Sequence, residues 1–310
     1  MFNKVLKSGL SVLFSLTISG FAIAQEPEIF KRDDFDLNGP VKNCRVITKY
    51  GQEEFEFNES GFLTKSTTRF TENDYSLTYY KFRDSVLLEI RNENYIQGQL
   101  DRATSIAHIY AMDSLPEKKI TERIFSYEKE FLDQYEYYYD ESGKLARVVR
   151  SNEEGVDETE IAHSAYKDEE TVSQLLNGVI QKSVRTSFKN KGTEAEQHII
   201  LKKEFLNGEP NKAFEEIKDN NGQLKSLKEY TFDQNKGEFG IVQKTEYEYD
   251  DKGNLSKETT ILGRAKSVKN YVYQFDGNIP GNWIKQIVTP DNTYKTRRIT
   301  YFDSEEKPEE

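Results

Sequence analysis

The stretch Tyr247-Glu248-Tyr249-Asp250-Asp251-Lys252-Gly253-Asn254-Leu255 is the pattern around which the chain is organised. In a strand, its two tyrosines lie two positions apart and point to one face, while the glutamates point to the other. Asp250 suits the first position of a type I turn, because its carboxylate can accept backbone N–H groups two residues on. Gly253 suits the last position, where positive φ closes a bulged hairpin. The stretch therefore predicts a β-hairpin whose leucine returns to the tyrosine face if the register holds.

Degenerate copies of this pattern occur from residue 55 onward. They are Phe55-Glu56-Phe57-Asn58 with Gly61 and Leu63, Tyr137-Tyr138-Tyr139-Asp140 with Gly143 and Leu145, Asp219-Asn220-Asn221-Gly222 with Leu224, and Tyr273-Gln274-Phe275-Asp276 with Gly281-Asn282-Trp283. A second set of turns lies between apolar runs, at Gln97-Gly98, Asn177-Gly178 and Asn207-Gly208. Because Asn-Gly is a strong hairpin signal and the two kinds of turn alternate, the chain is expected to be built from hairpin repeats.

The composition favours strands over helices. The chain has 19 Tyr and 19 Phe against 2 Met, and only 35% of its residues are hydrophobic, which suits a sheet with one aromatic face better than a thick core. Strands are predicted near 43–49, 53–57, 62–70, 75–83, 85–91, 101–111, 118–128, 133–139, 144–150, 158–166, 179–188, 196–205, 211–218, 223–232, 242–249, 255–261, 267–275, 283–288 and 294–302. Segment 169–176 fits a strand better than a helix, because Asn177-Gly178 follows it.

The predicted fold is all-β: antiparallel β-hairpin repeats that form an elongated, twisted meander sheet or an open solenoid-like structure. The predicted parts are a signal peptide at 1–24, an extended lead-in at 25–39, one β-repeat domain at 40–302 and an acidic tail at 303–310. The leader has Lys4 and Lys7, an apolar run too short to span a bilayer, and a small-x-small cleavage site before Gln25. We therefore expect a periplasmic or secreted protein, cleaved near Ala24/Gln25.

Charge and cysteine content narrow the functional classes. Removing the two leader lysines from 43 Lys+Arg leaves 41 against 54 Asp+Glu, a balance of −13, which disfavours nucleic acid and anionic lipid as partners. The single cysteine, Cys44, allows no intramolecular disulfide and is expected to be a small core residue. No phosphate-binding glycine loop, nucleophile elbow or paired cysteine is present, so we expect no cofactor. Arg297-Arg298 is interpreted as a solvated strand face.

The aromatic-x-aromatic-Asp-x-x-Gly-Asn-Leu pattern at 247–255 resembles the YD repeat of Rhs-type envelope proteins of Gram-negative bacteria. Residues 137–145 and 55–63 resemble it more loosely, and Gly281-Asn282-Trp283-Ile284-Lys285 with Arg297-Arg298-Ile299-Thr300-Tyr301 resembles the C-terminal repeat of small secreted proteins of that group. The resemblance implies β-hairpin repeats, an envelope location and a binding or encasing role. It implies no catalytic residues.

Candidate sites for metal or catalysis have structural explanations. Asp34-Phe35-Asp36-Leu37-Asn38-Gly39 matches half of a calcium loop, but the twelfth position is Arg45 in place of glutamate. The histidines His108, His163 and His198 lack the close spacing of zinc ligands, so no metal site is predicted. The carboxylates Asp140, Asp219 and Asp250 leave open an enzyme acting on envelope carbohydrate, but each is explained as a turn former.

The aromatic face is the better functional lead, because flat rings beside polar groups suit stacking on a sugar or a protein. The candidate binding residues are Tyr137, Tyr139, Tyr247, Tyr249, Tyr273, Phe275 and Trp283. We expect a non-enzymatic, monomeric binding or scaffold protein of the cell envelope, for carbohydrate or a protein partner. The alternatives are an immunity protein that neutralises an exported toxin and a carboxylate-dependent enzyme.

Overall fold

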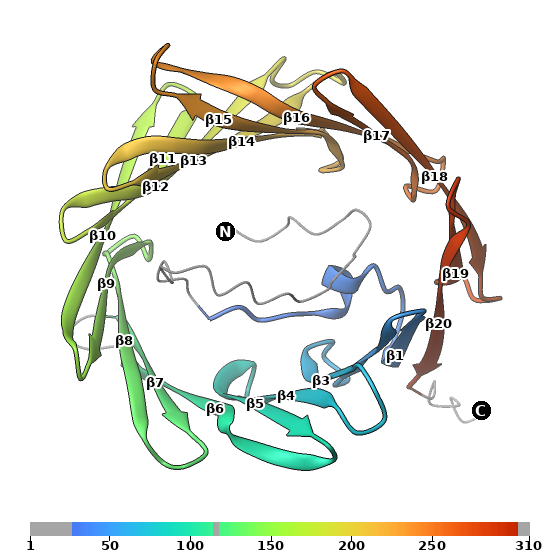
Figure 1. Cartoon of the computed structure of the whole chain (residues 1–310), viewed down its shortest axis with the longest axis horizontal. Coiled ribbons are helices and arrows are strands. Elements are labelled where there is room, and N and C mark those ends of the chain that lie inside the picture. The colour runs from blue at the N-terminus through green and yellow to red at the C-terminus, as the bar shows by residue number, and fades with distance from the viewer. Residues whose placement is uncertain (1–26, 114–117, 303–310) are drawn as a thin grey trace, which may run out of the picture.

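The computed structural model describes residues 27–113 and 118–302, which form one antiparallel sheet of 20 strands. Each strand pairs with the next strand in the chain (Figure 1). The strands are β1 (Val41–Thr48), β2 (Gly51–Phe57), β3 (Leu63–Arg69), β4 (Tyr75–Arg83), β5 (Val86–Ile96), β6 (Gln99–Asp113), β7 (Lys119–Ser126), β8 (Phe131–Tyr139), β9 (Leu145–Asn152), β10 (Gly155–Tyr166), β11 (Glu169–Leu176), β12 (Val179–Lys189), β13 (Gln197–Leu206), β14 (Glu209–Asp219), β15 (Leu224–Asp233), β16 (Glu238–Tyr249), β17 (Leu255–Leu262), β18 (Ala265–Phe275), β19 (Trp283–Thr289) and β20 (Thr293–Tyr301). The predicted leader and tail lie outside the described residues.

The sheet closes on itself, so the expected open, elongated sheet or solenoid is wrong. β1 pairs antiparallel with β20, with Val41 opposite Tyr301 and Cys44 opposite Ile299, and Figure 1 shows the resulting ring. Closure satisfies the backbone groups that two open edges would leave unpaired. Strands spaced about 4.8 Å apart and tilted by about 40° give a 20-stranded backbone ring roughly 40 Å across. The all-β, antiparallel meander that the sequence indicated is retained in this barrel.

The lead-in identifies the inward face of the wall. Residues 27–40, with a single 3-10 turn at Arg32–Phe35, lie inside the ring against β1–β4 (Figure 1). The ring centroid of Phe35 lies 4.5 Å from that of Phe55, so Phe55 points into the lumen. Cross-strand partners share a face, and the pairing carries this assignment around the barrel without a break. Glu54 and Glu56, which alternate with Phe55, therefore point outward.

The two kinds of turn lie at opposite ends of the barrel. The Asx-x-x-Gly turns of the repeated motif, after β2, β8, β14 and β16, follow even-numbered strands and lie at one end, which we name the Asx rim. The Asn-Gly hairpins follow odd-numbered strands and form the other end, the Asn-Gly rim. In the turn after β16, the Asp250 carboxylate accepts the Asn254 N–H at 2.8 Å, and Tyr249 pairs with Leu255 across a bulge, as predicted. The alternation of turns in the sequence thus reflects alternation between the rims.

Side chains join neighbouring hairpins at the Asx rim. The Tyr249 hydroxyl donates to the Leu224 carbonyl at 2.8 Å, and the Tyr273 hydroxyl donates to the Leu255 carbonyl at 2.9 Å. Each of these leucines begins the strand that follows a turn, and the tyrosine reaches it from the next hairpin along the chain. The repeated motif therefore connects each hairpin to its neighbour as well as forming its own turn.

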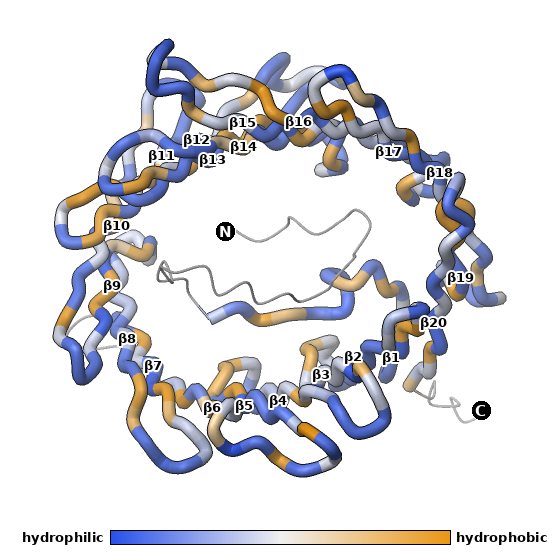
Figure 2. Tube along the Cα trace, in the orientation of Figure 1, coloured by the Kyte–Doolittle hydropathy of each residue, from blue (hydrophilic) through white to orange (hydrophobic). Residues whose placement is uncertain are grey.

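The main apolar cluster lies between the lead-in and the wall. It contains the buried residues Leu37, Val41, Cys44, Phe55, Phe57 and Leu63. Burial raises the pKa of the Cys44 thiol to about 11, which fits the predicted core role. Elsewhere polar and apolar residues alternate around the ring (Figure 2). Among the described residues, no helix has the length and apolar character needed to cross a bilayer.

Candidate functional site: the lumenal wall

All seven aromatic residues singled out from the sequence belong to the inward-facing set. Tyr137 lies opposite Val148, Tyr247 opposite Glu258, and Tyr273 opposite Gln286, all on the lumenal side. Tyr139, Tyr249, Phe275 and Trp283 follow by the two-residue alternation and its bulges. The shared face expected from the sequence is therefore the lumen, and a binding role for these residues stays a prediction.

Tyr137 belongs to a buried hydrogen-bond network within the wall. It is only 2% exposed, and its hydroxyl donates at 2.6 Å to the buried carboxylate of Glu122. The same carboxylate accepts a hydrogen bond from the Tyr110 hydroxyl at 2.9 Å and lies 2.7 Å from His108 Nδ1. Burial would raise the pKa of Glu122, but these hydrogen bonds outweigh it and leave that pKa lowered. His108 thus serves this buried network.

Cations cover the faces of several other candidate rings. Lys118 lies over Tyr139, Lys225 over Tyr249 and Lys252 over Phe275, at 4.6 to 5.3 Å from the ring centroids. These lysines come from the neighbouring hairpin, which strengthens the connections between hairpins. The aromatic ladder consequently holds the wall together, and only part of it faces open lumen.

Trp283 lies beneath a buried arginine that anchors the lead-in. The guanidinium of Arg297 is 3.6 Å from the Trp283 ring centroid, and it donates to the Phe35 carbonyl at 2.9 Å and to the Asp36 carbonyl at 3.3 Å. Arg297 is only 8% exposed. The expectation that Arg297 belongs to a solvated face is therefore wrong, because its position in β20 faces the lumen where the lead-in covers it.

Asn282 fixes the end of the lead-in. Its side chain is 1% exposed and accepts the Asn38 N–H at 2.7 Å while donating to the Asn38 carbonyl at 2.9 Å. Its amide also donates to the Tyr301 hydroxyl at 2.8 Å, and that hydroxyl donates to Asp276. Asn282 therefore pairs with both backbone groups of one residue, as a β-strand neighbour would. The sequence showed Asn282 only as part of a lengthened turn.

A cationic cluster on β12–β14 was not predicted from the sequence. Lys182, Lys202 and Lys218 point into the lumen together with Glu216, which accepts a 2.5 Å hydrogen bond from Lys202. Burial lowers the pKa of the Lys182 and Lys218 ammonium groups. His198 stacks on Phe188 in the same region, and burial lowers its pKa too. The cluster depends on cross-strand register, which the chain order does not show.

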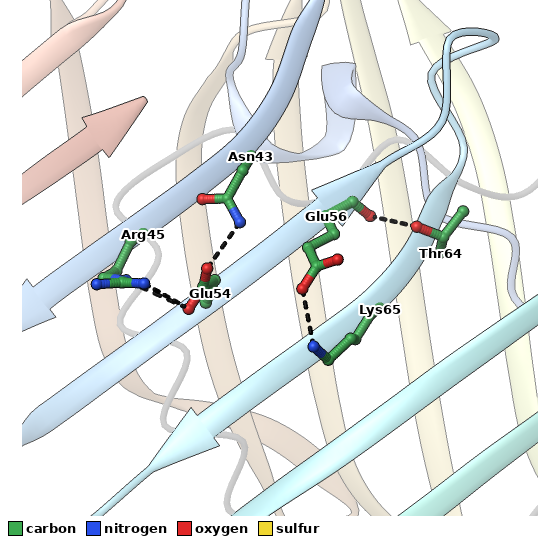
Figure 3. Close-up of polar contacts among 6 residues, drawn as sticks. All are labelled: Asn43, Arg45, Glu54, Glu56, Thr64 and Lys65. Atoms are coloured by element: carbon green, nitrogen blue, oxygen red, sulfur yellow. Dashed lines mark hydrogen bonds and ion pairs between the residues drawn. The ribbon is translucent and has the colours of Figure 1, made fainter. Parts of the chain in front are cut away.

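Ion pairs recur over the outward face. Figure 3 shows Asn43 and Arg45 with Glu54, and Glu56 with Lys65, on the side of β1–β3 away from the lead-in. Further outward pairs of this kind are Lys119–Glu136 at 2.8 Å, Lys228–Glu215 at 2.6 Å and Lys257–Glu248 at 2.7 Å. These lie within strands around the barrel. The outer wall therefore carries ion pairs on many of its strands.

The carboxylates considered for catalysis act in turns. Asp140, Asp219 and Asp250 each accept the backbone N–H of the residue four positions later, at 2.8 to 2.9 Å. In the lead-in, Asp34 accepts the Lys31 N–H. His163 Nε2 lies 2.8 Å from the Leu145 carbonyl. Within residues 27–113 and 118–302, no group of three or more His, Cys, Asp or Glu is arranged to hold a metal ion.

Comparisons with known proteins give only remote structural likenesses. No family model and no curated protein sequence matches the chain. A porin-like protein from Bacteroides uniformis is similar at 8% identity and a TM-score of 0.32, and one from Bacteroides vulgatus at 9% and 0.26; each similarity covers 85% of this chain and 99% of the other. The TcdB2-TccC3 structure is similar at 10% identity and a TM-score of 0.21, over 86% of this chain and 17% of that one.

The resemblance to YD-repeat, Rhs-type proteins is wrong. No family model of that kind matches, and the hairpins form a closed 20-stranded barrel in place of an open repeat array. The physical reason is that the motif specifies a hairpin turn and a connection to the next hairpin. Any antiparallel meander can use both features, so they do not distinguish one β-architecture from another.

Proposed function

We propose that this chain is a water-facing, non-enzymatic barrel that binds an extended polypeptide of a partner protein in its lumen. The observation that carries the proposal is the lead-in, a polypeptide segment already seated on the inner wall by hydrogen bonds to its backbone. A seated polypeptide favours a protein partner over a carbohydrate, the two ligand classes that the sequence did not distinguish.

The contacts with the lead-in use chemistry that is general for peptides. Asn282 pairs with both backbone groups of Asn38, and Arg297 caps two successive carbonyl groups. The wall adds strand-like bonds, because the Leu63 N–H donates to the Phe30 carbonyl at 2.9 Å and the Arg32 N–H donates to the Gly61 carbonyl at 3.0 Å. Backbone recognition of this kind supplies affinity, while pockets between aromatic rings supply preference for particular side chains.

The polarity of the outer wall supports a role in water. A transmembrane barrel presents an apolar band about 25 Å tall to lipid, and a charge on its lipid face costs about 2–4 kcal/mol at the midplane. Here mid-strand positions on the outer wall carry ion pairs such as Arg45–Glu54 and Lys228–Glu215. A barrel of this width also leaves open space inside, and the cationic cluster on β12–β14 suits a guest with acidic side chains.

Site-specific photocrosslinking in the native host tests the proposal. A photoreactive residue at Phe214 faces the lumen, whereas one at Leu201, on the adjacent strand, faces outward. We expect a polypeptide crosslink from position 214 and none from position 201. Equal crosslinking from both positions, or none from position 214 in a folded protein, would refute lumenal binding.

A binding experiment in vitro measures directly whether the inner wall binds a peptide. A labelled peptide of residues 27–38 is added to a barrel that lacks that segment, with circular dichroism to verify the β-structure. We expect saturable binding that is lost in Asn282→Ala and retained in Asn278→Ala, since the Asn278 amide is exposed and bonds to Asp276 and Tyr301, both on the wall. If the shortened barrel does not fold, the full chain carrying Asn282→Ala is used, and the same peptide should then compete with the loosened segment. An absence of binding in both formats would contradict the proposal.

A further inference from the structure

The lumenal face of β12–β14 lies across the ring from the lead-in (Figure 1) and carries an excess of positive charge. In the band of wall between the levels of Lys182 and Lys218, these strands point four lysines and two glutamates inward, a balance of +2: Lys182, Lys202, Glu204, Lys212, Glu216 and Lys218. On β15, Glu229 and Lys225 cancel, since both face the lumen. On β11, Glu170 is paired with Lys144 at 2.7 Å. The positive excess therefore belongs to β12–β14 themselves.

The cross-strand register arranges three of these lysines along one diagonal of the wall. Lys202 lies opposite Val184, which is two residues from Lys182 on β12. On β14 it lies opposite Phe214, which is four residues from Lys218. With about 4.8 Å between strands and about 3.3 Å per residue, the two ends of the diagonal lie roughly 20 Å apart. An extended polypeptide of about six or seven residues covers that length.

The wall does not balance the charge of this diagonal. Glu216 is only 5% exposed and accepts a hydrogen bond from Lys202. Burial and the charge of Lys202 lower the pKa of Lys182, although Glu204 opposite it acts in the other direction. Like charges held this close destabilise one another, and a bound anion relieves the repulsion. The diagonal is thus suited to a ligand with negative charge.

The same region also holds acceptors without partners, which favours a polypeptide over a small anion. Within the described part of the chain, Glu216 Oε2 and Gln174 Oε1 are buried and have no hydrogen-bond partner. Gln174 lies opposite Lys182, at one end of the diagonal. Both atoms require N–H or O–H donors, while the lysines require acceptors. An acidic peptide supplies side-chain carboxylates and backbone N–H groups together.

We propose that β12–β14 form a second seat in the lumen, which binds an extended acidic segment of the guest protein. Alternate residues of an extended strand share a face and lie about 7 Å apart, close to the spacing of about 7–8 Å between diagonal neighbours such as Lys182 and Lys202. These two lysines, which are partly exposed, contact successive carboxylates of the guest, and the buried Lys218 adds positive potential at the far end. This inference rests on the proposed function and adds the charge pattern of the guest to it.

Fluorescence anisotropy with two labelled peptides tests the proposal. One peptide of about seven residues alternates aspartate with serine, and its neutral counterpart has asparagine in place of each aspartate. The mature chain should bind the acidic peptide about ten-fold or more tightly than the neutral one, because the neutral peptide lacks the charge-assisted contacts. Equal affinities would overturn this inference and leave the proposed function standing, whereas no binding of either peptide would overturn both.

Two double variants locate the site. Lys182→Gln/Lys202→Gln should weaken binding of the acidic peptide about ten-fold and leave binding of the neutral peptide within about two-fold. The matched control Lys189→Gln/Lys203→Gln removes the same charge from the same two strands, but from outward positions. It should retain the affinity of the parent, with circular dichroism confirming the fold of each variant. Equal weakening in both variants would show an effect of net charge alone and would contradict a lumenal seat.

Glu216→Gln separates a binding role from a structural one. The change removes the carboxylate that engages Lys202, so the affinity for the acidic peptide should rise about three-fold or more. A cluster that serves the wall alone predicts a lower midpoint of urea unfolding with no gain in affinity, and that result would overturn the proposal. Tighter binding of a short galacturonate oligosaccharide than of the acidic peptide would overturn it as well, because the seat would then select a sugar acid.

Discussion

Substitution of Asn282 by alanine is expected to release the lead-in while leaving the barrel closed. The change removes three side-chain hydrogen bonds, two to the backbone of Asn38 and one to the Tyr301 hydroxyl. Each is worth about 1 kcal/mol net, and Asn38 is exposed enough to recover some bonding with water. Only the two bonds to Asn38 join the lead-in, so the free energy that holds it against the wall should fall by about 2 kcal/mol.

Hydrogen exchange measures this loss locally. A change of about 2 kcal/mol corresponds to exchange roughly 30-fold faster at amides that depend on the docked lead-in. Two such amides are the N–H of Arg32, which donates to Gly61, and the N–H of Leu63, which donates to Phe30. Amides in β12–β14, away from the lead-in, should exchange as before.

The control variant is Asn278→Ala in the same turn, because that side chain is exposed and its bonds are to Asp276 and Tyr301, both on the wall. It should leave exchange at Arg32 and Leu63 within about two-fold of the parent, consistent with a typical surface substitution. Two results would refute the reasoning. One is unchanged exchange in Asn282→Ala, and the other is acceleration spread evenly over all strands, which would make Asn282 a determinant of the barrel itself.

Four further outcomes are expected. Burial raises the pKa of the Glu53 carboxyl to about 7 from its usual 4.5, so the folded state binds this proton more tightly than the unfolded chain. This stabilisation is present below about pH 4.5 and is lost as the pH rises through 7. In thermal melts, the parent should therefore lose stability relative to Glu53→Gln across that pH range. Tyr137→Phe removes a donor to the buried Glu122 carboxylate and should cost about 1.5–3 kcal/mol in urea unfolding. Tyr249→Phe removes a bond to a backbone carbonyl and should cost only about 1 kcal/mol in the same assay. The mature chain should also purify without detergent and give the same circular dichroism with and without it, because ion pairs cover its outer wall.

The hairpins were predictable because their determinants are local. A turn such as Asp250 to Gly253 is specified by an aspartate that caps backbone amides and a glycine with a φ of 82°. Segment 169–176 is a strand, β11, as its Asn-Gly ending indicated. The placement of Tyr247 and Tyr249 on one face also followed from two-residue alternation. These features need information from no more than ten or so neighbouring residues.

The content of the candidate site was less predictable, because exposure depends on residues far apart in the chain. The sequence placed the aromatic residues on one face correctly, but it did not show that Glu122 would engage Tyr137 or that Arg297 would cover Trp283. Asn282 was missed for the same reason, since its partner Asn38 lies at the other end of the chain. Its one local signal was the turn that is longer than the other Asx-x-x-Gly turns.

Closure was the largest error, and its determinants were partly visible. A meander with an even number of strands places its first and last strands antiparallel, so β1 and β20 can pair with the same geometry as every other neighbouring pair. The inward residues of these strands, Cys44 and Ile299, are apolar and meet across the seam, while Arg297 reaches over the seam to hold the lead-in. In an open sheet, nothing would bury Arg297, and the backbone groups of both edge strands would be unpaired. The lead-in therefore favours closure: Ile299 and Tyr301 of β20 pack against the apolar cluster that the lead-in forms with β1–β3, so both ends of the sheet contribute to the surface on which the lead-in lies.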